Sequence, residues 1–337
     1  MNKLLTVVVP VYKVERYINK CLDSLILPDD QMDLVEVIVV NDGTPDQSAV
    51  MAKEYEKRFP NTFHVIDKEN GHYGSCINKA LEVATGKYFR PLDADDWMNT
   101  DALVSLLSLL ENNDNDLVVT THTNYLDNNR INHIKMPDSI VVNKQYDLKT
   151  LDFQKERIDC FLKMHTMTYK TSILKNISLK LSTGISYTDS EYCMFPLDKA
   201  NSVIFYDLDL YQYNLSREGQ TMQQGIITKS VKPFYLISTR MTDYFIKNYD
   251  RNNSVIRSNQ RCFIRLIIFY FFRVVLIFSA ENKETNKMLS SLMNLITQNK
   301  ELKDDILSLR YRKVPFVYIW YKFKIRILYY FPKKLLY

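Results

Sequence analysis

The sequence predicts an α/β fold, a mostly parallel sheet with flanking helices, followed by a C-terminal helical region. Two observations predict the sheet. Through the first 120 residues, short runs rich in β-branched residues alternate with segments of helical periodicity. These runs are mostly apolar, as in parallel strands that are covered on both faces. A third observation predicts the helical region: apolar residues lie three and four positions apart within residues 228–309.

Each expected strand is a short apolar run that ends at a turn or a polar residue. The first run ends at Pro10, and the second ends at Asn41-Asp42-Gly43, a common turn sequence. The expected strands are Leu4–Val9, Val35–Val40, Phe63–Asp67, Lys87–Leu92 and Leu117–Thr121. The expected helices, with apolar residues at helical spacing, are Glu15–Leu27, Asp46–Phe59, Tyr73–Ala84, Asp101–Asn112, Val231–Ile246 and Met288–Ile296.

The composition is that of a folded protein in a reducing compartment. The chain has 337 residues, 46% of them hydrophobic and 25% charged, which suggests about two domains. Its five cysteines are scattered without a Cys-x-x-Cys pair, so zinc and a disulfide framework are disfavoured. The N-terminus lacks a secretory signal. Arg265 and Arg273 interrupt the apolar stretch 262–279, which predicts a buried or interfacial helix rather than a membrane span.

The last part of the chain is basic and aromatic. From Arg310 onward there are eight Lys and Arg residues and no Asp or Glu, with many aromatic residues in Val314–Leu328. This composition favours an anionic membrane surface as partner, and nothing nearby resembles a nucleic-acid-binding module. In the alternative, the tail completes the core through Phe316, Tyr318, Trp320 and Phe323. The pattern leaves strand and helix both open.

Three carboxylates, Asp93, Asp95 and Asp96, follow the fourth expected strand. Carboxylates this close repel one another unless solvent or a cation compensates them, and their oxygens suit Mg²⁺ or Mn²⁺. A calcium loop of the EF-hand type would need Gly and Glu at positions where this segment has neither. Asp96 or Asn99 could instead cap the following helix, but capping accounts for one polar residue, not three. The cluster predicts a metal–diphosphate site.

Other polar or turn-forming residues follow the first two expected strands. These are Pro10-Val11-Tyr12 and Asn41-Asp42-Gly43-Thr44. In sheets of this class ligands bind beyond the carboxyl ends of the strands, so the three segments should converge on one edge. The Gly-x-Gly-x-x-Gly fingerprint is absent after the first strand, as is the Walker pattern, which disfavours NAD, FAD and P-loop chemistry.

Six segments together carry a family resemblance. They are Val7–Tyr12, Val37–Thr44, Glu69–Gly71, Asn78, Gly86–Tyr88 and Asp93–Asp96. Their order and spacing across residues 4–100 resemble the family 2 glycosyltransferases. The resemblance implies a GT-A fold, a nucleotide-diphosphate sugar donor (usually a UDP-sugar), a divalent cation, Mn²⁺ or Mg²⁺, and inversion at the anomeric carbon.

The resemblance also implies roles for single residues. The residues expected at the nucleotide are Pro10, Val11, Tyr12, Asp42, Asn70, Asp93 and Ala94. Asp93 would lie near the ribose and the metal, and Asp95 would bind the metal; for Asp42 an Asx turn is the alternative. Residues 72–78 depart from the family's usual Gly-Val-Ser-x-Ala-Arg-Asn, so contacts of that arginine cannot be transferred.

An inverting transfer also needs a base that accepts the proton of the acceptor hydroxyl. The segment Tyr187–Tyr192 lies where the family commonly has Glu-Asp-x-x-Phe, with Asp189 in register. Asp189 is therefore the expected base, and Glu191 is the alternative. Thr188-x-x-Glu191 reads as a capping box, which would give Glu191 a structural role and leave Asp189 ionised near the helix dipole.

Further along, Arg217 lies in a charged loop after an expected strand. Similar Arg-Glu-Gly-Gln segments occur in related bacterial glycosyltransferases, and an arginine here could grip the diphosphate. A solvated turn is the alternative. His72, His122 and His165 could each line the pocket, but a polar or core role is the prediction for each.

Taken together, the sequence predicts a bacterial-type inverting glycosyltransferase with a nucleotide-sugar-binding part (1–100), an acceptor side (101–215) and a C-terminal helical domain (216–337). Expected acceptors are a glycan, a lipid-linked molecule or a protein in cell-surface polysaccharide or glycoconjugate synthesis. The alternatives are a sugar nucleotidyltransferase and a non-catalytic nucleotide-sugar-binding scaffold at the membrane. We expect a cytoplasmic protein, peripheral on the inner membrane face if the tail binds lipid, and leave a homo-oligomer open.

Overall fold

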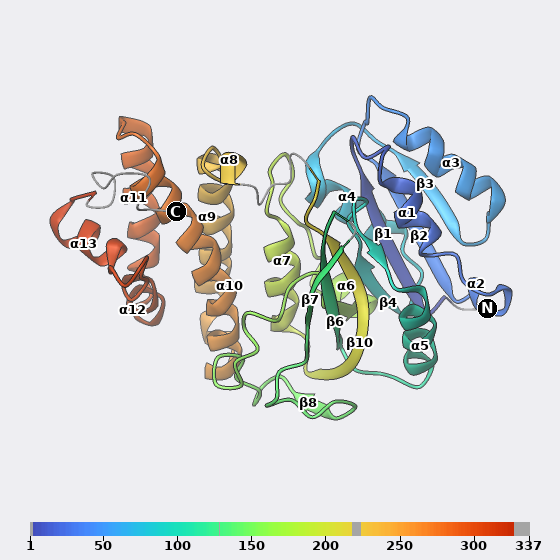
Figure 1. Ribbon diagram of the computed structural model, residues 1–337. Coiled ribbons are helices and arrows are strands. Elements are labelled where there is room, and N and C mark those ends of the chain that lie inside the picture. The colour runs from blue at the N-terminus through green and yellow to red at the C-terminus, as the bar shows by residue number, and fades with distance from the viewer. Residues whose placement is uncertain (1–2, 128, 218–223, 327–337) are drawn as a thin grey trace. The chain divides into compact units, whose positions relative to one another are not determined.

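The computed structural model describes residues 3–127, 129–217 and 224–326. The chain divides into two compact units, Met1–Glu218 and Gly219–Tyr337. The first contains a ten-stranded sheet with helices around it, and the second consists of helices (Figure 1). The predicted α/β class with a C-terminal helical region is confirmed.

Four parallel strands form one half of the sheet. They are β3 (Phe63–Asp67), β2 (Val35–Asn41), β1 (Leu5–Val11) and β4 (Tyr88–Pro91), in that spatial order. In β1, Val7 pairs with Val37 of β2 on one side and with Arg90 of β4 on the other. Nearly every side chain of β1 and β2 is buried, which is why their sequences are mostly apolar. Two buried polar side chains within them, Thr6 and Glu36, hydrogen-bond to each other at 2.6 Å.

The connecting segments are helical, close to the predicted ranges. They contain α1 (Ile18–Asp23), α2 (Asp29–Met32), α3 (Ser48–Arg58), α4 (His72–Val83) and α5 (Thr100–Glu111). The α5 helix begins after Asn99, whose side chain accepts a hydrogen bond from the Ala102 amide at 3.2 Å. Asn99 therefore provides the cap that the sequence suggested, and Asp96 is left for another role.

The other half of the sheet is mixed. Its strands are β5 (Trp97–Met98), β6 (Leu117–Leu126), β7 (Asn129–Ile134), β8 (Gln145–Asp147), β9 (Met167–Lys170) and β10 (Ser202–Asn214). The short β9 strand is antiparallel to both β4 and β6, and β10 is parallel to β6. The long strands β6 and β10 therefore run in the same direction as β1 to β4. As a result, the residues after β10 emerge at the same edge as the residues after β1, β2 and β4.

Two short helices and one 3₁₀ turn complete the first unit. They are α6 (Thr171–Asn176), α7 (Asp189–Met194) and the 3₁₀ turn Phe195–Asp198. The α7 helix packs next to the sheet through Tyr192, whose hydroxyl donates a hydrogen bond to the Phe89 carbonyl of β4 at 3.1 Å. This contact ties the helix that begins at Asp189, the expected base, to the strand that precedes the three aspartates.

The second unit is built from α8 (Gln224–Ile227), α9 (Val231–Asn248), α10 (Ser254–Arg273), α11 (Lys283–Ile296), α12 (Lys300–Leu307) and α13 (Phe316–Phe323), with a 3₁₀ turn at Tyr249–Arg251 and a π-helical turn at Val274–Phe278. The predicted buried helix in 262–279 is confirmed by α10, whose Ile264, Ile268 and Phe271 are fully buried. Arg265 pairs with Asp305 at 3.7 Å. Among the described helices, none has both the length and the apolarity to cross a bilayer.

Part of the basic tail belongs to the core of this unit. In α13, Phe316 and Trp320 are buried, whereas Tyr318 and Phe323 are exposed, Phe323 by 64%. The Arg326 guanidinium is also buried and donates hydrogen bonds to the Val275 carbonyl and the Asn286 side chain. Residues 327–337, which hold the last two lysines of the tail, lie outside the described residues. The tail thus combines buried anchors with an exposed aromatic and basic surface.

Candidate active site

The loop after β4 holds the three predicted carboxylates in three different environments. Asp96 is buried and accepts hydrogen bonds from the Tyr211 hydroxyl at 2.5 Å and from the Asn214 amide at 2.7 Å. Burial, together with the negative charges of Asp95 and Asp93, raises the pKa of Asp96 well above its usual range. Asp96 thereby ties the loop to the end of β10.

Asp93 differs because no hydrogen bond among the described residues involves its carboxylate. Burial raises the pKa of Asp93 to about 8, the charges of Asp95 and Asp189 add to the rise, and Arg217 opposes it. These electrostatic effects mean that the carboxylates of the loop and of α7 lie near one another. An uncompensated carboxylate among others is the environment in which a cation is stabilising.

Asp95 faces a positive charge. Its Oδ2 lies 3.2 Å from Nη1 of Arg217, in the segment that follows β10. The Asn214 side chain, at the end of β10, donates to the Asp95 carbonyl at 3.2 Å. The end of β10 therefore fixes the backbone of Asp95 and also precedes Arg217, the residue that faces the Asp95 carboxylate. The predicted metal residue and the predicted diphosphate-binding arginine are thus neighbours.

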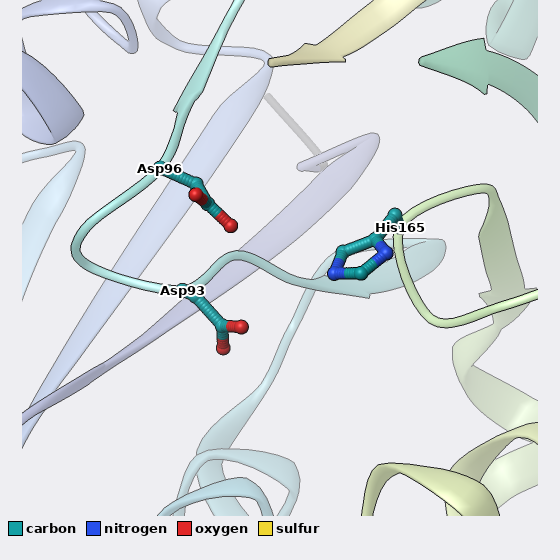
Figure 2. Close-up of side chains that lie close together, drawn as sticks. All are labelled: Asp93, Asp96 and His165. Carbon is teal, nitrogen blue, oxygen red and sulfur yellow. The ribbon is translucent and has the colours of Figure 1, made fainter. Parts of the chain in front are cut away.

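His165, for which the sequence predicted only a polar or core role, completes this group. Ligand atoms of Asp93, Asp96 and His165 lie within 4.8 Å of one another, and Figure 2 shows the imidazole directing one nitrogen toward the two carboxylates. His165 comes from the loop before β9, about seventy positions after the aspartates. A single histidine without a neighbouring motif gives no sequence signal. By contrast, His122 lies buried in β6, where burial lowers its pKa to about 4.

The predicted nucleotide residues lie at the ends of β1 and β2. The Asp42 amide donates to the Val11 carbonyl at 3.0 Å, and the Asn70 side chain donates to the Asp42 carbonyl at 3.0 Å. The Asp42 carboxylate accepts from the Lys68 ammonium at 2.6 Å and from the Gly71 amide at 2.9 Å. Burial alone would raise the pKa of Asp42, but Lys68 and the Gly71 amide outweigh it and the pKa is lowered.

The remaining nucleotide candidates differ in exposure. Tyr12 is 41% exposed beside partly exposed Pro10 and buried Val11, so an aromatic ring is accessible just after the end of β1. Ala94 is buried between the aspartates and contributes backbone to the loop.

The predicted capping box at the start of α7 is wrong. Thr188 has helical dihedral angles (φ −76°, ψ −9°) instead of the extended ones that a capping side chain needs, and its hydroxyl makes no capping hydrogen bond. Glu191 is fully buried and accepts hydrogen bonds from the Ser182 amide at 2.7 Å and its hydroxyl at 2.8 Å. Glu191 does have a structural role, but its partner is the preceding loop.

Asp189 is the first residue of α7 and is half-buried. Burial raises the pKa of Asp189, and hydrogen bonds from its own backbone amide and that of Ser190 only partly oppose the rise. The expectation that the helix terminus alone would keep this carboxylate ionised therefore misses the larger effect, which is desolvation. A carboxylate with a raised pKa holds a transferred proton more readily.

A tight seam joins the loop before α7 to the start of α4. The Asn78 side chain donates to the Leu181 carbonyl at 2.9 Å and accepts from the Leu181 amide at 2.7 Å. The Gly184 amide donates to the Gly71 carbonyl at 2.8 Å. At Gly74 a Cβ atom would lie 2.1 Å from the Ser182 carbonyl, so only glycine allows this approach. This seam, residues 71–78 against 181–184, includes the stretch 72–78 whose sequence departs from Gly-Val-Ser-x-Ala-Arg-Asn.

A protein-family model matches this chain. The model of glycosyl transferase family 2 covers residues 6–178, more than half of the sequence. The chain belongs to this family. The matched range includes the three aspartates, the Asp42 region and His165, and it ends before Asp189 and Arg217.

Curated relatives and solved structures agree with the assignment. GgaB of Bacillus subtilis, a minor teichoic acid biosynthesis protein, is 23% identical over 95% of this chain and 35% of its own length. The putative glycosyltransferase EpsH of the same species is 30% identical over 62% of this chain and 60% of EpsH. The chain thus spans about a third and three fifths of these relatives. The crystal structure of Staphylococcus aureus TarS with UDP-GlcNAc covers 97% of this chain and 89% of that fragment, with a TM-score of 0.64 and 20% identity. The predicted GT-A fold is confirmed by this likeness.

Proposed function

We propose that this protein transfers a sugar from a UDP-sugar to an acceptor hydroxyl with inversion, using a divalent cation. The observation that supports the proposal most is the convergence, at one edge of the sheet, of Asp93 and Asp95 with Arg217, which comes from the end of a different strand. An acidic loop facing an arginine matches a diphosphate bridged by a cation on one side and gripped by a guanidinium on the other.

The donor-binding roles follow from the two strand ends. We assign the base of the nucleotide to Tyr12 and the backbone at Pro10 and Val11, with Asp42 and Asn70 beside it. Lys68 and Gly71 hold the Asp42 carboxylate in one orientation, so this group is ordered before a nucleotide arrives. Such order lowers the entropy cost of binding.

We assign the metal to Asp95 and Asp93, and Asp93 would also lie near the ribose. The fit rests on Asp93, whose carboxylate has no hydrogen bond among the described residues and whose pKa is raised by its surroundings. Mn²⁺ or Mg²⁺ bound there would neutralise charge on the departing diphosphate. A guanidinium has five N–H donors. Arg217 could therefore bind a diphosphate oxygen with some of them while others stay near Asp95.

Asp189 is assigned the role of base. The acceptor oxygen forms a bond to the anomeric carbon while the bond from that carbon to the diphosphate oxygen breaks. The acceptor proton passes to the Asp189 carboxylate, and UDP leaves with the electron pair of the broken bond. Glu191 is a poor candidate because its carboxylate is buried against Ser182.

For the acceptor we propose a cell-surface polymer or a lipid-linked precursor of one. The support comes from relatives: GgaB is named for minor teichoic acid biosynthesis, and TarS is a poly(ribitol-phosphate) β-N-acetylglucosaminyltransferase at 25% identity over 68% of this chain. Attachment to an anionic membrane surface through the exposed face of α13, which carries Phe323 and Lys322, would bring the enzyme to such acceptors.

The test is incubation with UDP-, GDP- and dTDP-sugars, with Mn²⁺ or Mg²⁺ and with EDTA, and detection of the released nucleotide. Metal-dependent release of UDP supports the proposal. Diphosphate release from UTP and a sugar phosphate would instead identify a nucleotidyltransferase. Binding of UDP-sugars without turnover, with every acceptor class supplied, would identify a binding protein.

A further inference from the structure

We infer that His165 supplies a nitrogen ligand to the cation at Asp93 and that the site consequently prefers Mn²⁺ to Mg²⁺. This inference rests on the proposed function and identifies its cofactor. The juxtaposition that carries it is the convergence of Asp93, Asp96 and His165, whose ligand atoms lie within 4.8 Å of one another (Figure 2).

The imidazole is held in place from several sides. Its ring lies against Tyr211 and Tyr213 of β10, with ring centroids 4.7 Å and 4.6 Å away. The backbone carbonyl of His165 accepts a hydrogen bond from the guanidinium of Arg90, which is fully buried in β4. A side chain with such support is ordered before any ligand binds, as metal ligands usually are.

The ring nitrogens are not used within the protein. No hydrogen bond among the described residues involves the His165 imidazole, and its Nδ1 is buried without a partner. Nδ1 is not the nitrogen that faces Asp93, so the inference rests on the other ring nitrogen, Nε2. Nε2 is directed at the carboxylates of Asp93 and Asp96, yet no hydrogen bond joins the ring to either of them.

The spacing suits a small cation. Two ligands of an octahedral ion with bonds of about 2.1 Å lie roughly 3.0 Å apart when adjacent and roughly 4.2 Å apart when opposite. The ligand atoms of Asp93 and His165 lie within 4.8 Å of each other, so rotation of these side chains by at most about 1.8 Å brings them to one ion. Of the two carboxylates, Asp93 is the better ligand, because Asp96 already accepts from Tyr211 and Asn214. Asp96 keeps the loop in position while Asp93 and His165 bind.

The donor set decides between the metals. Mg²⁺ binds almost entirely through oxygen and keeps several waters, whereas an imidazole nitrogen favours first-row transition ions. A site of carboxylates, diphosphate oxygens and one imidazole therefore selects Mn²⁺ from the two ions that sugar–diphosphate chemistry commonly employs.

The experiment compares the full chain with two variants, His165→Gln and the matched control His122→Gln. His122 is also buried, and its ring lies 5.9 Å from that of His165, but it does not belong to the group around Asp93. UDP binding is measured by calorimetry with Mn²⁺ and with Mg²⁺, and pulsed electron paramagnetic resonance of bound Mn²⁺ detects ¹⁴N coupled to the metal.

In the parent and in His122→Gln we expect ¹⁴N coupling and tighter UDP binding with Mn²⁺ than with Mg²⁺. In His165→Gln the coupling should vanish, and the Mn²⁺ to Mg²⁺ affinity ratio should fall at least about tenfold, the scale that even outer-sphere partners of a metal carry. If His165→Gln melts much lower than the parent, His165→Asn takes its place.

Two results would overturn the inference: Mn²⁺–UDP binding by the parent without ¹⁴N coupling, or coupling and metal preference that persist in both His165 variants. Either would leave the proposed function intact. Failure of the parent to bind UDP with any metal would instead remove the proposed function itself.

Discussion

Replacement of Glu191 tests which of two neighbouring carboxylates is structural. In Glu191→Ala the Ser182 amide and hydroxyl lose a buried acceptor that they reach at 2.7 Å and 2.8 Å. Hydrogen bonds to a charged group contribute about 1.5–3 kcal/mol each, so the free energy of unfolding should fall by about 3–6 kcal/mol. Because Glu191 is fully buried, solvent screening does not reduce this figure. At about 2–4 °C per kcal/mol for a domain of this size, the melting temperature should fall by on the order of 10 °C.

Glu191→Gln is the milder form of the same change. The amide keeps the volume and one acceptor oxygen, and its NH₂ can donate to the Ser182 hydroxyl after that group rotates, so a loss of about 1–2 kcal/mol is expected. Turnover per folded molecule should stay within about tenfold of the parent, because Asp189 remains in place.

The assays are thermal and urea unfolding, UDP affinity, and the rate of transfer measured well below the melting temperature. Asp189→Asn serves as the mirror-image variant, with near-parental melting and UDP affinity but transfer reduced by about 10²–10⁴-fold. The reasoning is refuted if Glu191→Gln melts like the parent and loses transfer by a hundredfold or more, since Glu191 would then be the base.

The other predictions concern metal, pH, diphosphate and membrane. Asp95→Ala should abolish metal-dependent UDP binding in calorimetry while circular dichroism stays parental; full metal dependence in the variant would contradict the assignment. Burial raises the pKa of Asp189, and the base works only when deprotonated, so transfer should fall as pH drops through a value above the usual aspartate range; a flat pH–rate profile down to pH 4 would contradict this. Arg217→Lys should keep the charge but lose the two-pronged grip, lowering the transfer rate more than UDP affinity, and a parental rate would argue for a solvated turn. Phe323→Glu should weaken sedimentation with anionic vesicles without changing the melt, whereas deletion of 310–337 should also destabilise the second unit; vesicle binding unaffected by Phe323→Glu and by salt would remove the membrane proposal.

The strands around the site could be predicted because each is marked locally. A run rich in valine and isoleucine such as Val35–Asn41 is typical of a strand covered on both faces, and turn residues mark its end. The polar residues at the ends of β1, β2 and β4 could be placed together for the same reason, since parallel strands end at one edge.

What the sequence did not predict depends on partners that lie far along the chain. The sequence of Thr188-x-x-Glu191 satisfies a capping box, but whether Glu191 turns back to its own helix or toward Ser182 is decided by the path of the preceding loop. Because β9 is antiparallel to β4, the loop before β9, with His165, lies beside the loop after β4, with Asp93. No local sequence pattern predicts the four-residue strand β9. Contacts of this kind, between residues far apart in the sequence, appear only in three dimensions.

The seam between residues 71–78 and 181–184 bears on how enzymes of this kind could be re-engineered. Under the proposed function the segment before α7 lies on the acceptor side, so a change of acceptor would begin with an exchange of this segment for that of a relative. In this protein the segment cannot be exchanged by itself, because Asn78 and Gly74 of α4 contact its backbone directly. A graft that omits this face of α4 would lose the two hydrogen bonds between Asn78 and Leu181. A graft that places any larger residue at position 74 would bring its Cβ atom into collision with the Ser182 carbonyl. The smallest transferable module therefore has two pieces, roughly a hundred residues apart in the chain.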